Sequence, residues 1–207
     1  MGPYPDVTWA VIAGGQARRL SGVPKGLLEF EGRPVLEWLL ALSPLFAETL
    51  LVANFPEPYA RFGLRAVADR VPGKGAPGGV HAALSAAHTE WVMAVACDMP
   101  FVAPAAVRVL LEARSPEVDA VAFTVDGRVE PLLAVYRASL AAPWGEVLTH
   151  GNPSLRGLLA QCRARLLPEE ALRAVDPVLR SRVSVNTPED LARWGLTEPG
   201  VPGAGKR

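Results

Sequence analysis

Short apolar runs alternate along this chain with longer segments of mixed polarity. The runs are apolar throughout rather than at every second position, which is typical of strands buried on both faces of a sheet. They predict strands at residues 9–12, 49–53, 65–68, 91–96, 120–124 and 132–136.

The segments between these runs predict helices at residues 34–42, 58–62, 79–87, 104–113, 140–149, 155–163 and 188–194. The last helix is the best marked, because Thr187 can cap it, Pro188 suits its first turn, Asp190 stands near the capping-box position and Gly195 can end it. A regular succession of strand and helix predicts an α/β fold, a doubly wound and mostly parallel sheet with helices on both faces. Ligands of such sheets bind in a crevice beyond the carboxyl ends of the strands, and the Gly14–Gly15 loop and the residues after Ala96 should share that crevice.

The composition fits one domain. Of 207 residues, 50% are apolar, enough for a substantial core, and we expect a single domain over residues 1–195 with a loose tail at 196–207. Lys plus Arg and Asp plus Glu both number 21, so the formal net charge is zero. This balance argues against a broad nucleic-acid surface but leaves room for a local basic pocket.

The cysteine and histidine positions argue against a metal centre built from these residues. Cys97 and Cys162 stand far apart with no metal-ligand spacing, which indicates buried reduced thiols in a cytoplasmic protein. His81, His88 and His150 also lack the spacing of a zinc site. We find no signal-peptide pattern and no apolar run near the ~20 residues of a membrane helix, so we expect a soluble, cytoplasmic protein with no membrane contact.

A glycine pair and a basic loop follow the first predicted strand. The sequence from residue 12 reads I-A-G-G-Q-A-R-R-L-S-G-V-P-K, with Gly14 and Gly15 followed by Arg18, Arg19 and Lys25. Glycines permit close backbone approach, and three positive charges suit a nucleoside triphosphate. The spacing is neither that of a P-loop nor that of a dinucleotide fingerprint. The alternative is an ordinary strand-to-helix turn with solvated basic residues.

Asp98 ends the fourth predicted strand, and Pro100 prevents the strand from continuing. A carboxylate at this place faces the predicted crevice and suits Mg²⁺, which binds one or two carboxylates together with substrate phosphates. The alternative is that Asp98 forms a turn or caps the helix predicted at 104–113.

Two further polar residues follow predicted strands. Asp69 precedes a Gly- and Pro-rich loop that leads to Gly79, the predicted helix start where an anion is favoured, and its carboxylate can accept bonds from N1–H and the 2-amino group of guanine. The alternative for Asp69 is a surface pair with Arg65 or Arg70. Asn54 either bonds a base edge or forms an Asx-turn.

The sequence shows no Ser-His-Asp or Cys-His arrangement for nucleophilic catalysis. A basic loop that faces a metal-binding carboxylate is instead what phosphoryl or nucleotidyl transfer requires, because that chemistry depends on positioning and charge neutralisation.

Five ordered motifs carry a resemblance to a known family. They are the opening segment I-A-G-G-Q-A-R-R-L-S-G-V-P-K-G at 12–26, G-R-P at 32–34, A-P-G-G-V at 76–80, C-D-M-P-F at 97–101 and S-V-N-T-P-E-D-L at 184–191. Together they resemble the molybdenum cofactor guanylyltransferases, nucleotidyltransferases with a doubly wound, nucleotide-diphospho-sugar-transferase-like fold. The resemblance covers residues 11–194.

The resemblance implies transfer of GMP from GTP to the terminal phosphate of molybdenum-bound molybdopterin, with release of pyrophosphate. It implies GTP along residues 12–15, Mg²⁺ on Asp98, guanine recognition by Asp69 and Asn54, and phosphate contacts from Lys25 and Arg19. The nucleotide-binding residues are then Ile12, Ala13, Gly14, Gly15, Lys25, Asn54, Asp69 and Asp98. Ala-Gly-Gly at 13–15 favours guanine over cytosine, since related cytidylyltransferases tend to carry A-A-G.

The acceptor side rests on the late motif and a preceding arginine. Asn186, Ser184 and Arg156 are the residues that would hold a molybdopterin-type acceptor, although Arg156 fits a helix surface equally well. Three positions depart from the family pattern: Pro24 replaces an aspartate, Ser184 replaces an asparagine, and Val52 replaces the first asparagine of N-A-N.

Three alternatives stay open at this point: another base such as CTP, another phosphate acceptor such as a sugar phosphate, or a GTP-binding accessory protein without catalysis. Our working expectation is a monomer that binds GTP and the acceptor, does not bind nucleic acid, and contacts molybdopterin-delivering proteins transiently.

Overall fold

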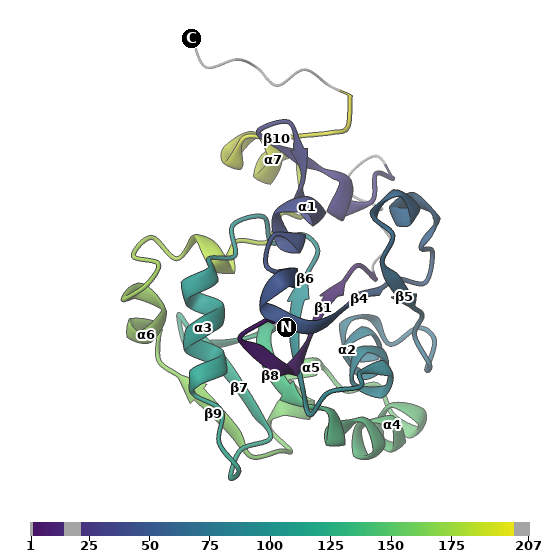
Figure 1. Ribbon diagram of the computed structural model, residues 1–207, viewed down its shortest axis with the longest axis vertical. Helices are drawn as coiled ribbons and strands as arrows, with labels where there is room; N and C mark the ends of the chain where they lie inside the picture. Colours follow the sequence, from purple (N-terminus) through teal and green to yellow (C-terminus); the bar gives the residue numbers. More distant parts are fainter. Residues whose placement is uncertain (1, 15–21, 201–207) are drawn as a thin grey trace.

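The protein is built around one mixed sheet. The computed structural model describes residues 2–14 and 22–200. Within them lies a seven-stranded sheet with the order β5-β4-β1-β6-β8-β7-β9 (Figure 1). Its strands are β1 (Tyr4–Ile12), β4 (Phe46–Val52), β5 (Arg65–Val67), β6 (Trp91–Ala96), β7 (Ala120–Val125), β8 (Arg128–Arg137) and β9 (Ala164–Leu167).

Helices and a small second sheet complete the fold. The α-helices are α1 (Val35–Leu40), α2 (Gly75–Ala86), α3 (Pro104–Glu112), α4 (Ala141–His150), α5 (Leu155–Leu159), α6 (Glu169–Arg173) and α7 (Pro188–Trp194). Short 3-10 helices are η1 (Lys25–Leu27), η2 (Ser43–Leu45), η3 (Glu57–Phe62), η4 (Ala138–Leu140) and η5 (Arg180–Arg182). The second sheet joins β10 (Leu196–Thr197), β2 (Glu29–Phe30) and β3 (Arg33–Pro34).

The prediction of a doubly wound, mostly parallel sheet is confirmed, with one reversed strand. Strand β1 runs parallel to both β4 and β6, and β7 runs parallel to β9. Strand β8 runs antiparallel to both of its neighbours, β6 and β7. The start of β8 therefore lies at the same edge of the sheet as the end of β6.

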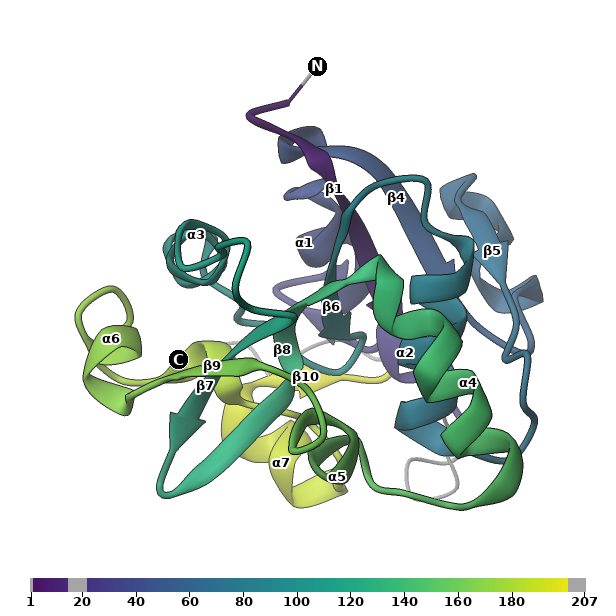
Figure 2. The same cartoon turned by 90° about the horizontal axis from the view of Figure 1, so that it is seen from below.

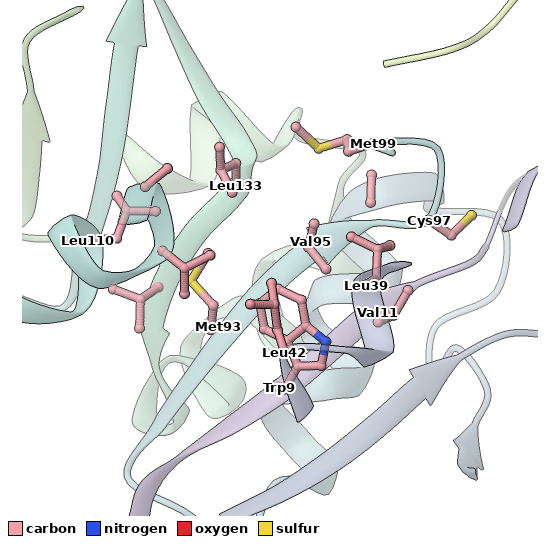
Figure 3. Packing of buried hydrophobic residues seen from close by; sticks show 14 of the residues in the cluster. Trp9, Val11, Leu39, Leu42, Met93, Val95, Cys97, Met99, Leu110 and Leu133 are labelled. Carbon is pink, nitrogen blue, oxygen red and sulfur yellow. The ribbon is translucent and has the colours of Figure 1, made fainter. Parts of the chain in front are cut away.

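The two faces of the sheet are buried in separate cores. On β1, Trp9 and Val11 pack with residues of α1, α3 and α6, whereas Ala10 and Ile12 pack with residues of α2, α4 and α5. Figure 2 shows α3 and α6 on one side of the strands and α2 and α4 on the other. Figure 3 shows the first core, where Trp9 packs beside Leu42 and Met93. Burial on both faces explains why the strands are apolar throughout.

Several element boundaries differ from the predictions. Helix α2 begins at Gly75 rather than Gly79, so half of the predicted loop is helical. The predicted helix at 58–62 is the 3-10 helix η3, and the one predicted at 155–163 ends at Leu159, before β9. Within the segment expected as tail, Leu196 is buried in β10.

Neither cysteine is in a disulfide. Cys97 is buried, as predicted, but Cys162 is only partly buried. Burial raises the pKa of Cys97 to about 12 and that of Cys162 to about 11, so both thiols stay protonated at neutral pH. Among residues 2–14 and 22–200 there is no helix with the length and apolar character that a bilayer crossing requires.

Candidate functional site

The carboxyl ends of four parallel strands lie in register at one edge of the sheet. Ile12 of β1 pairs with Val52 of β4 and with Ala96 of β6, and Val52 pairs with Val67 of β5. The residues that follow these ends include Gly14, Asn54, Asp69 and Asp98. The fold thus brings four segments that are far apart in sequence to one edge, as the strand prediction required.

Asp98, Lys25 and Asn186 are joined in one cluster. Lys25 Nζ lies 2.7 Å from Asp98 Oδ2 and also donates a hydrogen bond to Asn186 Oδ1. The side chains of Lys25 and Asp98 are 24% and 12% exposed, so the ion pair is largely shielded from water. Lys25 therefore joins two other predicted site residues, although the three come from η1, the end of β6 and the segment before α7.

The other carboxylate oxygen of Asp98 has no partner in the part of the chain that the structure describes. Asp98 Oδ1 is buried and accepts no hydrogen bond from the described residues. An unpartnered buried carboxylate oxygen is costly unless something binds it. Across residues 2–14 and 22–200, no group of three or more His, Cys, Asp or Glu forms a metal cage. One free carboxylate oxygen fits a Mg²⁺ ion that takes its remaining ligands from phosphates and water.

The segment before α7 is held against Asp98 by backbone and capping bonds. Val185 N–H donates to the main-chain oxygen of Asp98 at 2.9 Å. Asp190 Oδ2 accepts from the N–H groups of Asn186 at 2.8 Å and Thr187 at 3.0 Å, and Thr187 Oγ1 accepts from Asp190 N–H at 3.2 Å. This is the predicted capping box, and it positions Asn186 as well as α7.

The side chain of Asn186 also contacts Ser184, because its Nδ2 donates to Ser184 Oγ at 2.8 Å. The serine at position 184 therefore still takes part in the polar cluster around Asn186, despite the departure from the family pattern.

Asn54 and Asp69 form a reciprocal pair. Asn54 Nδ2 donates to Asp69 Oδ2 at 2.9 Å, and Asn54 Oδ1 accepts from Asp69 N–H at 2.8 Å. Asp69 is partly buried, whereas Asn54 is exposed. Both polar atoms of the Asn54 amide are used on Asp69, so Asn54 orients the carboxylate in this structure.

The start of α2 packs closely against this pair. A Cβ at Gly79 would lie 2.9 Å from Ile12 Cγ2, and one at Gly78 would lie 3.4 Å from Asp69 Oδ2. The glycines in the A-P-G-G-V segment thus let the first turns of α2 approach β1 and Asp69.

Two adjoining cavities open at this edge of the sheet and share Ala13 and Gly14. The Asp98 cavity has a volume of about 350 Å³, and the Asp69 cavity about 410 Å³. The polar residues of the Asp98 cavity are Lys25, Asp98, Glu130, Arg182, Ser184 and Asn186. The Asp69 cavity is lined by Asn54 and Asp69, by Phe55, Pro58 and Tyr59, and by glycines near the start of α2.

Most predicted site residues lie in these cavities, with three exceptions. Gly15 and Arg19 fall outside the residues that the structure describes. Arg156 is exposed on α5 and donates to Val129 O at 3.1 Å, so it lines neither cavity. It lies near Glu130, whose pKa is raised by burial, and its charge offsets a part of that rise.

Phe55, Glu130 and Arg182 are among the lining residues that the sequence did not point to as site residues. Phe55 is 73% exposed in the Asp69 cavity. Its position directly after Asn54, at the end of a predicted strand, is the sequence signal that could have pointed to it. Glu130 and Arg182 face the Asp98 cavity together. Arg182 stands two residues before Ser184, but Glu130 had no visible signal, because it lies before the predicted start of its strand and that strand is reversed.

A doubly wound sheet with a two-part cleft across the carboxyl ends of its strands defines a nucleotide-binding type of α/β protein. The MobA-like NTP transferase domain family matches residues 9–166, and the chain belongs to this family.

Similar proteins agree with this assignment. A probable molybdenum cofactor guanylyltransferase from Chloroflexus aggregans is 37% identical, over 87% of this chain and 89% of the relative. The crystal structure of molybdopterin-guanine dinucleotide biosynthesis protein A from Archaeoglobus fulgidus has a TM-score of 0.79 and 31% identity, over 90% of this chain and 96% of that one. A CMP:2-keto-3-deoxy-manno-octonic acid synthetase structure, with a TM-score of 0.69 and 14% identity over 91% of this chain and 96% of the other, shares the fold alone.

Proposed function

We propose that this protein transfers GMP from GTP to the terminal phosphate of molybdenum-bound molybdopterin. The observation that supports this most directly is the Lys25–Asp98–Asn186 cluster in one cavity, next to a carboxylate suited to guanine in the adjoining cavity. The names of the related proteins supply the acceptor.

The nucleotide would span both cavities. Asp69, oriented by Asn54, would accept hydrogen bonds from N1–H and the 2-amino group of guanine in the Asp69 cavity. The ribose and triphosphate would cross the shared Ala13–Gly14 backbone into the Asp98 cavity. Arg19 and Gly15, which lie outside the described residues, would add phosphate contacts, as the resemblance implies.

In the transfer step, an oxygen of the acceptor phosphate attacks the α-phosphorus of GTP. The new bond joins this oxygen to the α-phosphorus, the bond to the β-phosphate oxygen breaks, and pyrophosphate leaves with the electron pair. No general base is needed, because the attacking phosphate is already an anion. A Mg²⁺ ion held at Asp98 Oδ1 would neutralise charge on the phosphates.

Lys25 would change partners during the reaction. In this structure its Nζ pairs with Asp98 Oδ2 at 2.7 Å. When phosphates enter the cavity, its ammonium group would turn toward them and stabilise the departing pyrophosphate. Asn186 and Ser184 would then contact the acceptor from the wall that α7 holds in place.

The test is a screen of GTP, ATP, CTP and UTP with Mg²⁺ and molybdenum-bound molybdopterin, with pyrophosphate release as the readout. We expect release with GTP far above that with the other three. Equal use of CTP, release with a sugar phosphate in place of molybdopterin, or GTP binding without release would each contradict the proposal in a different way.

A further inference from the structure

The Asp98 cavity contains a second acidic residue that the transfer does not use. Glu130 lies near the start of β8, its side chain is 21% exposed, and its Oε1 lies 3.6 Å from Arg182 Nε. Because β8 is reversed, this carboxylate stands at the same edge of the sheet as Asp98.

A carboxylate without a bridging metal ion does not suit a phosphate subsite, because it repels phosphate oxygens and can only accept hydrogen bonds when ionised. Lys25 and Asp98 already account for the phosphate end of the cavity. Glu130 therefore indicates that this wall of the cavity receives a ligand group that carries hydrogen-bond donors.

The electrostatic surroundings of Glu130 also favour contact with hydrogen-bond donors. Burial raises the pKa of Glu130, and the charge of Asp126 adds to this rise, whereas Arg182 and Arg156 lower it. The two arginines do not overcome the loss of water around the carboxylate. Donors from a bound ligand would stabilise its charged form.

We propose that Glu130 recognises the 2-amino-4-oxopyrimidine ring of a pterin acceptor, by accepting hydrogen bonds from its ring N–H and its 2-amino group. This inference rests on the proposed function, which supplies a pterin as the acceptor. The ring has the same two adjacent donors as guanine, so the protein uses one oriented carboxylate for each heterocycle.

Each of the two carboxylates has a neighbour that positions it: Asn54 by hydrogen bonds to Asp69, and Arg182 by an ion pair with Glu130 at 3.6 Å. Arg182 Nη1 also pairs with Asp126 Oδ2 at 2.5 Å. Arg182 is thus a positioning residue, and Glu130 is the one that contacts the acceptor.

The experiment compares Glu130→Gln with wild type in two equilibrium titrations. One follows the pterin fluorescence of molybdopterin without GTP, and the other follows GTP binding by calorimetry. We expect Glu130→Gln to weaken molybdopterin binding at least roughly tenfold, because the amide replaces one acceptor with a donor that faces a ligand donor. GTP affinity should stay within about twofold of wild type.

Asp126→Asn is the matched control, since it removes the charge of the other carboxylate that pairs with Arg182. The side chain of Asp126 is 68% exposed and lines neither cavity. It should leave both affinities within about twofold. Unchanged molybdopterin binding in Glu130→Gln, no measurable binding to wild type, an equal loss in Asp126→Asn, or a loss of GTP affinity in Glu130→Gln would each overturn the inference. Because binding needs no turnover, Glu130-dependent binding without pyrophosphate release would contradict the proposed function alone.

Discussion

At the scale of single residues, Asp98 uses its two carboxylate oxygens for different purposes. Oδ2 is paired with Lys25 at 2.7 Å, while Oδ1 is buried and has no partner among the described residues. Native proteins rarely leave a buried carboxylate oxygen unpaired, so the arrangement favours an ion at Oδ1. Carboxylate charge, rather than hydrogen bonding alone, is then what the site requires.

Asp98→Asn keeps the shape of the side chain but removes that charge. We expect turnover to be nearly abolished, because loss of a metal ligand that stabilises the transition state costs several kcal/mol. Pyrophosphate release measures this, with urea unfolding to verify that the fold survives. Turnover within tenfold of wild type, a loss of only about 1.4 kcal/mol, would show that Asp98 does not hold the metal.

Phe55 is a second residue whose position predicts a role. It is 73% exposed beside Asn54 in the Asp69 cavity, where a flat base could stack on its ring. Base–aromatic stacking contributes about 1–3 kcal/mol. We expect Phe55→Ala to raise the KM for GTP roughly tenfold and Phe55→Tyr to leave it nearly unchanged. Val178→Ala is the control, because Val178 is equally exposed at 72% but lines neither of the two cavities. If both alanine variants behave alike, Phe55 does not stack on the base.

At the scale of elements, the direction of a strand decides which of its ends reaches the cleft. The apolar run at 132–136 predicted a strand correctly. Whether a strand runs parallel or antiparallel to its neighbours, however, leaves no local pattern in the sequence. Parallel placement would have put Glu130 at the opposite edge of the sheet, and the reversal of β8 brings it to the Asp98 cavity. Strands β2, β3 and β10 span two residues each, too few for any periodicity to show.

Helix α7 illustrates the opposite case, in which the sequence predicted both an element and its cap, while the resemblance pointed to the residues just before it as part of the site. The capping box of Thr187 and Asp190 was legible from residue types and spacing, and the structure confirms it. The same Asp190 carboxylate also holds the backbone of Asn186, whose side chain accepts from Lys25.

Thr187→Ala should therefore affect stability and the site together. Loss of an N-cap costs about 1 kcal/mol, and we expect the free energy of unfolding to fall by that amount in urea titrations. Because Asn186 would be held less firmly, the KM for the acceptor should also rise several-fold.

Ser154→Ala provides the matched control for that variant. Ser154 caps α5, with its Oγ accepting from Gly157 N–H at 3.0 Å, and it lines neither cavity. It should lose similar stability with unchanged kinetics. Identical kinetic behaviour in the two variants would mean that the α7 cap does not position the acceptor wall.

At the scale of the whole molecule, the site depends on the alignment of strand ends. Short apolar runs were enough to predict that the Gly14–Gly15 loop and the residues after Ala96 share one crevice, because parallel strands end together. Asn54 and Asp69, which also follow predicted strands, end at the same edge. The sequence could not predict that Asn54 would be used on Asp69, or that Lys25 would pair with Asp98. Those contacts depend on side-chain positions that only the assembled sheet determines.

We propose above all that this cleft selects guanine through Asp69 and transfers GMP to an acceptor phosphate. The most direct test is kcat/KM for GTP, ATP and CTP in wild type and in Asp69→Asn. The variant offers one acceptor where guanine needs two, and its amide donor faces a guanine donor, so the loss should be far greater for GTP than for ATP or CTP. An equal loss for all three nucleotides would contradict the account, because Asp69 would then support the fold or the phosphates rather than the base.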